Sequence, residues 1–197
     1  MQLRPDLSQD RDRLKINLEW ESPRVARTGE IVAFDVETTG LSPHRGHRVI
    51  EIGAVRVLNG AFTGEFHSLI DCGGSISMSA QRIHGITPAM LRGQPPPAAA
   101  FAAFRDFIGQ APLAAHNARF DMSFLRYEFG RLGWLLPNRS LCTLEACRRR
   151  LLRLPDYRLE TVARRVLGLL PIDSRRHRAL DDARLVARVW VALGEGK

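Results

Sequence analysis

The chain has 197 residues and a formal net charge of +8 at pH 7, because 29 Lys and Arg residues outnumber 21 Asp and Glu residues. No apolar run reaches the roughly 18 residues that a membrane-spanning helix needs, and the N-terminal residues lack the apolar core of a secretory leader. Three cysteines without CxxC spacing argue against a disulfide scaffold or a zinc site, so we expect a cytoplasmic protein.

The excess of positive charge has two readings. It favours binding of a polyanion such as nucleic acid. However, every cation except Lys15 and Lys197 is Arg, which fits an Arg-rich genome composition equally well. Composition alone leaves both readings open.

Strands dominate the first half of the predicted order. Residues 1–29 are polar and are expected to form an N-terminal arm ahead of one domain at 30–197. The segment 31–37 is predicted as a strand. Two more strands are predicted within 48–70, joined at Asn59-Gly60, a dipeptide typical of two-residue hairpins. The polar chain after residue 70 carries no predicted element.

Helices alternate with short strands in the second half. An amphipathic helix is predicted after the prolines at 95–97, ending at Gly109, and a short strand follows at 111–117. Asn117 is a candidate cap for the next helix, at 118–134. An edge strand is expected at 140–142. Further helical patterns cover 141–152, 157–169 and 177–193. Together these predict an α/β fold with a mixed sheet of about five strands, the first three a meander, flanked by helices.

Asp35 and Glu37 are the most informative pair in the sequence. Residues two apart in a strand point to the same face, so these carboxylates project together while Phe34 and Val36 face the other way. Two adjacent buried carboxylates repel each other unless a proton, an Arg or a divalent cation compensates. A strand end that runs into solvent with two satisfied acids is the alternative.

Further acids follow at two later helix starts. Asp121 falls one turn into the helix after the 111–117 strand, where open α/β sheets build their sites, although an acid there also stabilises the helix dipole. Asp182 shares the apolar side of the last predicted helix, whereas Asp181 lies on a more exposed side. His177 is expected at the entrance of that helix, on a segment that can reach the same site. An ordinary surface histidine is the alternative.

Three ordered segments, FDVETTG, AHNARFD and HRALDDA, resemble the exonuclease motifs of the DEDDh family. This family belongs to the DnaQ-like 3′–5′ exonucleases, which include the epsilon proofreading subunit of bacterial DNA polymerase III. The similarity runs from about residue 30 to residue 193. Arg178 stands where a sister group has Tyr. The matched catalytic residues are Asp35, Glu37, Asp121, His177 and Asp182.

The resemblance implies a ribonuclease H-like fold and two divalent cations, Mg²⁺ or Mn²⁺, held by the four acids. Asp35 would bridge the two ions, and His177 would be the general base. The implied reaction is hydrolysis of DNA from a free 3′ end, releasing nucleoside 5′-monophosphates. The implied substrate contacts are Thr38, Thr39, His84, Asn117 and Phe120, and arginines 175, 176 and 178 could contact phosphates.

Competing functions remain open at this point. An exoribonuclease that trims RNA fits the same motifs. A non-catalytic nucleic-acid-binding module is disfavoured, because all four matched acids and the matched histidine are present. Relatives of the epsilon type associate with DNA polymerase through a C-terminal tail. Because no such tail follows here, we expect a stand-alone or accessory nuclease, with polymerase association as the alternative.

Overall fold

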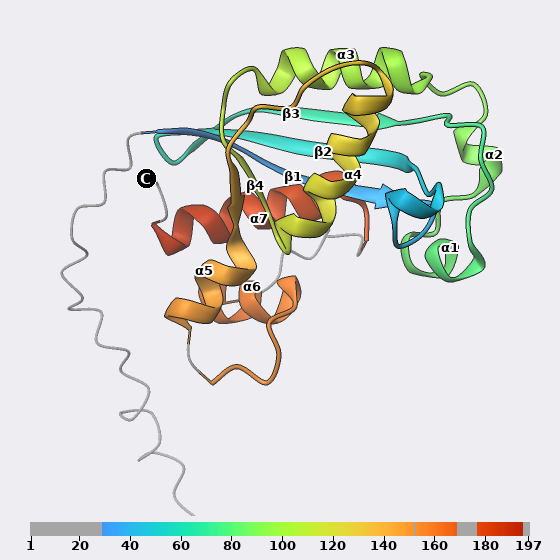
Figure 1. The fold of residues 1–197 in the computed structure, drawn as a ribbon. Coiled ribbons are helices and arrows are strands. Elements are labelled where there is room, and N and C mark those ends of the chain that lie inside the picture. The colour runs from blue at the N-terminus through green and yellow to red at the C-terminus, as the bar shows by residue number, and fades with distance from the viewer. Residues whose placement is uncertain (1–28, 152, 169–176, 195–197) are drawn as a thin grey trace, which may run out of the picture.

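The computed structural model describes residues 29–151, 153–168 and 177–194 (Figure 1). The predicted arm at 1–29 lies outside the described residues apart from Gly29. A mixed sheet of five strands forms the centre, as predicted, and its strand order is β3-β2-β1-β4-β5. β1, β2 and β3 form an antiparallel meander, and β4 and β5 run parallel to β1. The strands are β1 Glu30–Thr38, β2 Val49–Leu58, β3 Ala61–Leu69, β4 Leu113–Ala115 and β5 Ser140–Cys142.

Helices cover both faces of this sheet (Figure 1). α3 and α4 pack on one face. α7 lies on the other face against β1 and β2, and α5 and α6 pack beside it. The helices are η1 Pro43–Arg45, α1 Met78–His84, α2 Pro88–Leu91, α3 Pro97–Ile108, α4 Ala118–Arg131, α5 Thr143–Arg150, α6 Leu159–Leu167 and α7 Ala179–Leu193.

The alternation of side chains along β1 divides the core in two. Phe34 and Val36 point towards α3 and α4, while Ile31 and Ala33 point towards α7. Since side chains alternate with a period of two, Asp35 continues the row that faces α7, and so does Glu37. The two acids therefore extend an apolar row at the end where β1 leaves the core.

A glycine brings α7 close to the sheet. Gly53 of β2 is the register partner of Asp35, and a Cβ at Gly53 would lie 2.2 Å from the backbone nitrogen of Leu180. Such an approach is open only to glycine. The first turn of α7 therefore rests directly on β2, next to Asp35.

Local chemistry explains the predicted turns and one difference. Asn59 and Gly60 both have positive φ, 53° and 83°, as a type I′ hairpin turn requires. α3 ends before Gly109 as predicted. Asn117 does occupy the N-cap position of α4, but its side chain makes no capping hydrogen bond, because its backbone is left-handed with φ 68°.

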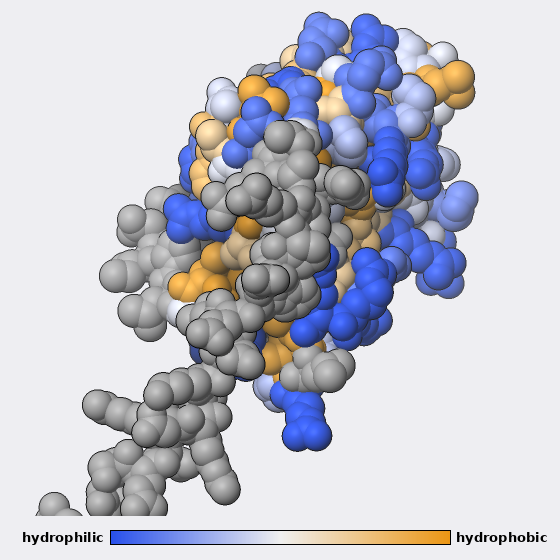
Figure 2. All heavy atoms as spheres, turned by 90° about the vertical axis from the view of Figure 1, so that its left-hand side faces the viewer, coloured by the Kyte–Doolittle hydropathy of each residue, from blue (hydrophilic) through white to orange (hydrophobic). Residues whose placement is uncertain are grey.

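Figure 2 views the molecule from the side of the β2–β3 turn, where hydrophilic residues are interrupted by smaller hydrophobic areas. Leu58, Phe62 and Val191 are among the exposed apolar side chains. Within the described residues, no helix is long and apolar enough to span a bilayer.

Candidate active site

Three acids converge where β1 meets α7. One carboxylate oxygen from each of Asp35, Glu37 and Asp182 lies within 4.8 Å of the others. Asp182 reaches this position because Gly53 lets the first turn of α7 approach the sheet. Asp181 is not part of this group. It pairs instead with Arg184 of the same helix, at 3.0 Å.

Asp121 adjoins the same cluster from α4. Its side chain is almost fully buried, and its carboxylate accepts hydrogen bonds from its own backbone N–H and from that of Val36. Its negative charge raises the pKa of Asp35, and the charge of Asp182 raises its own pKa. The structure therefore brings all four predicted acids into one electrostatic neighbourhood, with Asp121 outside the tight group of three.

Burial and repulsion from neighbouring acids raise the pKa of each of the four predicted acids. Burial is the largest cause at each of them. It raises the pKa of Asp35 well above its usual value, with Asp121 and Asp182 adding to the shift. The pKa of Glu37 rises to about 8, and those of Asp121 and Asp182 to about 7. At neutral pH the cluster therefore favours either bound protons or a bound cation.

The donor set of the cluster fits a divalent metal. Carboxylate oxygens are the ligands that hard cations such as Mg²⁺ and Mn²⁺ prefer. Among the described residues, Arg178 opposes the rise in the pKa of Glu37 only weakly, and its guanidinium is bidentate to Glu51. Asp35, Glu37 and Asp182 could hold a metal directly, with Asp121 beside them. The arrangement implies the use of a divalent metal.

His177 lies where the sequence pattern placed it, at the entrance of α7. Its side chain is exposed, its φ is 58°, and its backbone N–H donates a hydrogen bond to the carboxylate of Asp182. The histidine is thus anchored to a cluster acid through its main chain while the imidazole stays accessible. Arg175 and Arg176 lie outside the described residues.

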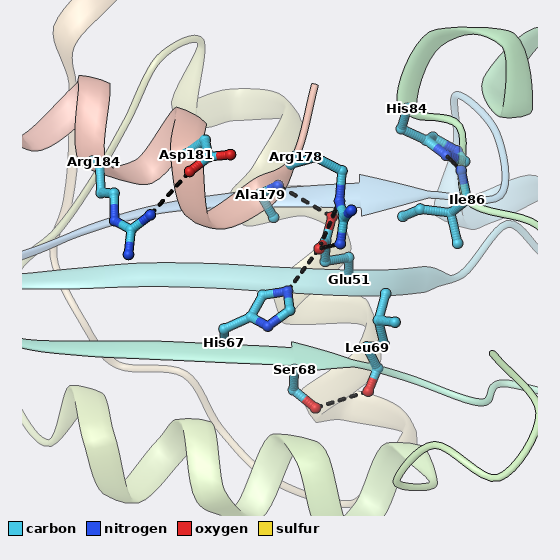
Figure 3. Close-up of polar contacts among 10 residues, drawn as sticks. All are labelled: Glu51, His67, Ser68, Leu69, His84, Ile86, Arg178, Ala179, Asp181 and Arg184. Atoms are coloured by element: carbon cyan, nitrogen blue, oxygen red, sulfur yellow. Dashed lines mark hydrogen bonds and ion pairs between the residues drawn. The ribbon is translucent and has the colours of Figure 1, made fainter. Parts of the chain in front are cut away.

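Glu51 of β2 is a further acid at this site that the sequence patterns did not single out (Figure 3). Its side chain is completely buried. Its carboxylate accepts hydrogen bonds from Arg178 Nη2 at 2.7 Å, from His67 Nε2 at 2.7 Å and from the backbone N–H of Ala179 at 3.1 Å. Burial alone would raise the pKa of Glu51, but these hydrogen bonds lower it to about 2. Glu51 engages Nε and Nη2 of Arg178, so contact of this residue with phosphate stays a prediction.

The two threonines after the acids build the turn at the end of β1. Thr38 Oγ1 donates a hydrogen bond to the backbone carbonyl of Gly40 at 2.7 Å. Thr39 Oγ1 accepts one from the backbone N–H of Arg48 at 2.9 Å. Both side chains are buried, so their hydroxyls hold the turn in shape.

His84 is buried, and one of its two ring nitrogens has a clear hydrogen-bond partner. Its Nδ1 accepts a hydrogen bond from the backbone N–H of Ile86 at 3.0 Å, so Nε2 is the protonated nitrogen (Figure 3). Nε2 has no hydrogen-bond partner among the described residues. Burial lowers the pKa of His84, and the nearby Thr38 backbone opposes that shift. The ring is thus held at the end of β1, with Nδ1 bonded to Ile86 and the backbone of Thr38 beside it.

Asn117 and Phe120 differ in exposure at the start of α4. Asn117 is exposed. Phe120 is partly buried and packs on Phe124 with ring centroids 5.0 Å apart, so much of its surface belongs to the core.

Comparison with protein families gives a match over most of the described chain. The RNase T family model, described as exonuclease, matches residues 32–190. The chain is 35% identical over 175 residues to the DNA polymerase III subunit epsilon of Rickettsia typhi, covering 84% of this chain and 74% of that protein. It is 38% identical over 164 residues to the PolC-type DNA polymerase III of Thermotoga maritima. That match covers 83% of this chain but only 12% of that relative.

Solved structures agree with the fold. Exonuclease X in complex with 5′ overhanging duplex DNA is 26% identical, with a TM-score of 0.66, and the match covers 83% of this chain and 89% of that one. Escherichia coli exonuclease I in complex with a dT13 oligonucleotide has a TM-score of 0.70 at 20% identity, covering 83% of this chain and 40% of that one. The latter likeness concerns the fold alone, and it confirms the ribonuclease H-like architecture that the motifs implied.

Proposed function

Because the chain belongs to the RNase T/DnaQ-like exonuclease family, we propose that it is a metal-dependent 3′–5′ exonuclease acting on DNA. Its products would be nucleoside 5′-monophosphates. The observation that carries this proposal is the convergence of Asp35, Glu37 and Asp182 from two distant segments, with Asp121 adjoining them. Such a costly arrangement of acids is expected at a functional site rather than in a stabilising core.

Two divalent cations, Mg²⁺ or Mn²⁺, would be held by these four acids. Bound there, they supply Lewis-acid chemistry that polarises water and stabilises charge on the phosphate. The raised pKa values of the acids support the assignment, because a cation relieves the same repulsion that otherwise favours protons.

His177 is proposed as the general base. A neutral imidazole has one unprotonated ring nitrogen, which can take the proton from the attacking water. The support is positional: the side chain is exposed, and its backbone is anchored to the carboxylate of Asp182.

The terminal nucleotide is proposed to sit against the turn that follows β1. Thr38 and Thr39 shape that turn, and the Nε2–H of His84, beside the Thr38 backbone, would donate a hydrogen bond to the sugar or phosphate of the 3′ end. Asn117, exposed at the start of α4, and the accessible part of Phe120 are proposed to contact the next part of the strand.

DNA is preferred over RNA because of the named relatives. Two are DNA polymerase III proteins, and exonuclease X was solved with duplex DNA. We also propose association with a DNA polymerase, because two of these relatives are polymerase proteins. A pull-down with a polymerase alpha subunit tests this association.

Degradation of labelled oligonucleotides tests the proposed function. Single-stranded DNA carrying a 3′ or a 5′ label is incubated with Mg²⁺, Mn²⁺ or EDTA. Immediate release of the 3′ label as a mononucleotide, a ladder from the 5′-labelled strand and complete inhibition by EDTA are expected. A matched RNA strand should be degraded more slowly, and preferential loss of RNA would instead favour the exoribonuclease. Binding with Mn²⁺ but no cleavage would identify a non-catalytic binding module.

A further inference from the structure

Glu51 lies beside the acid cluster but is bound in a different way. It sits directly opposite Glu37 across the β1–β2 pair. It is nevertheless not part of the group formed by Asp35, Glu37 and Asp182. Its two oxygens are occupied by Arg178, His67 and the backbone of Ala179. A carboxylate with this many donors is held ionised and is not free to take up a metal ion.

Glu51 accepts a hydrogen bond from the first backbone N–H group of α7. The N-cap residue of this helix, Arg178, makes no side-chain capping hydrogen bond of the usual kind. The first backbone N–H groups of a helix have no partner inside the helix, and they carry its positive dipole end. Glu51 Oε2 accepts the N–H of Ala179, the first residue of α7, at 3.1 Å. A side chain of the sheet thus caps the helix that carries Asp182.

We propose that Glu51 is a positioning residue: by binding Arg178 and capping α7, it fixes the turn that presents Asp182 to Asp35. This inference rests on the proposed function, in which those acids hold the metal. The bidentate guanidinium fixes direction as well as distance, because its fork geometry matches a carboxylate. Arg178 is likewise a positioning residue.

The same helix offers a matched control. Glu65 of β3 binds Arg184 of α7 through two hydrogen bonds at 2.8 and 2.6 Å. This pair also links α7 to the sheet, but both side chains are more than two-fifths exposed. It does not touch the cluster of three acids. Loss of the Glu65 pair therefore reports what an ordinary exposed ion pair contributes.

Mn²⁺ binding to the metal-free protein tests the proposal without relying on turnover. Glu51→Gln should weaken Mn²⁺ binding, measured calorimetrically, by about 10–100-fold, the usual effect of losing an outer partner of a metal ligand. Glu65→Gln should bind Mn²⁺ like the parent protein. Amide hydrogen exchange of residues 179–182 should accelerate in Glu51→Gln and not in Glu65→Gln. At saturating Mn²⁺, the KM for an oligonucleotide should stay the same while kcat falls.

A second pair of variants separates positioning from simple electrostatics. Arg178→Gln removes a positive charge near the cluster, so charge alone predicts tighter Mn²⁺ binding. Positioning predicts weaker binding, as in Glu51→Gln. Arg188→Gln, at an exposed position on α7, is the control and should change neither Mn²⁺ affinity nor exchange at residues 179–182. The Arg178 variant also decides the matter if Glu51→Gln does not fold.

Two results would overturn the inference: unchanged Mn²⁺ affinity and amide exchange in Glu51→Gln, or tighter Mn²⁺ binding by Arg178→Gln. Failure of the proposed function gives a different pattern, since the parent protein itself would then bind no Mn²⁺ and cleave no oligonucleotide. In that case the exchange rates of residues 179–182 still show whether Glu51 holds the start of α7.

Discussion

Glu37 and Glu51 face each other across two adjacent strands, and the protein shifts their acidities in opposite directions. The pKa of Glu37 rises to about 8, because it is buried among other acids, chiefly Asp182 and Glu51. The pKa of Glu51 falls to about 2, because hydrogen bonds from His67, Arg178 and Ala179 outweigh its burial. One carboxylate is thus kept charged by the protein itself, while its neighbour needs a proton or a cation.

The stability of the metal-free protein should therefore fall as pH rises from about 5 to 8. Glu37, Asp121 and Asp182 have folded-state pKa values of about 8, 7 and 7, above those of free acids. The folded state holds more protons than the unfolded state in this window, so each acid destabilises it by up to about 1.4 kcal/mol per pH unit. Urea unfolding in EDTA across this range measures the slope.

Saturating Mn²⁺ is the control for that slope. Metal displaces the protons and binds the folded state more tightly as pH rises, so stability with Mn²⁺ should no longer fall. The opposite shift of Glu51 acts only between its pKa of about 2 and the ordinary value of 4.5, outside the tested window. Burial also lowers the pKa of His84 and of His116 from 6.5, which opposes the fall in stability only below that pH. A flat or rising stability in EDTA between pH 6.5 and 8 would contradict the assigned burial of these acids.

Asp35→Asn should separate stability from function. The change removes a buried charge from between like charges, so the metal-free protein should gain roughly 1 kcal/mol at pH 8. Mn²⁺ should no longer raise the melting temperature, and turnover should fall on the order of 10³-fold or more, since metal chemistry supplies several kcal/mol. Asp106→Asn, at an exposed position on α3, should alter neither quantity. Retained Mn²⁺ binding in the Asp35 variant would remove this residue from the metal site.

His177→Asn should lower turnover about 10²–10⁴-fold while leaving Mn²⁺ affinity unchanged. Asn is chosen because His177 has a φ of 58°, which Asn tolerates better than most residues, so the backbone is preserved. Single-turnover hydrolysis and calorimetric Mn²⁺ titration give the two quantities. The exposed His44 provides the control as His44→Asn, with normal turnover expected. Normal turnover in the His177 variant would rule out this residue as the base.

Gly53→Ala should displace α7. The new methyl group would lie 2.2 Å from the backbone nitrogen of Leu180. Overpacking of this kind lowers the free energy of unfolding by roughly 3 kcal/mol or more. Urea unfolding measures the loss, and Mn²⁺ binding should weaken in the same variant because Asp182 moves with the helix. Gly64→Ala on β3 is the matched control. Its methyl group would meet only a side-chain carbon of Phe107, at 3.5 Å, so a change below about 1 kcal/mol is expected. Equal effects of the two substitutions would count against the close approach at Gly53.

Local patterns predicted those parts of the fold that depend on near neighbours. The predicted Asn59-Gly60 turn requires two positive φ angles, and both residues have them. The predicted alternation along β1 places Asp35 and Glu37 on one face. The short helices α1 and α2 were not predicted, because seven and four residues carry no amphipathic period. A closer reading of Ser77 and Gly85 could have located α1, since they cap its two ends.

The acid that was missed depends on partners far along the chain. Glu51 stands within an apolar strand, and its main partner, Arg178, follows 127 residues later. No local spacing links the two residues. For the same reason Arg178 looked like a free cation beside the motif, whereas folding commits its guanidinium to Glu51.

The seating of α7 on Gly53 also sets when the protein becomes active. In a growing polypeptide the meander that bears Asp35 and Glu37 leaves the ribosome long before the segment bearing Asp182. Under the proposed function, a nascent chain is harmless to the nucleic acids around it until that late helix docks. Any later displacement of α7 from β2 would inactivate the enzyme without breaking a covalent bond.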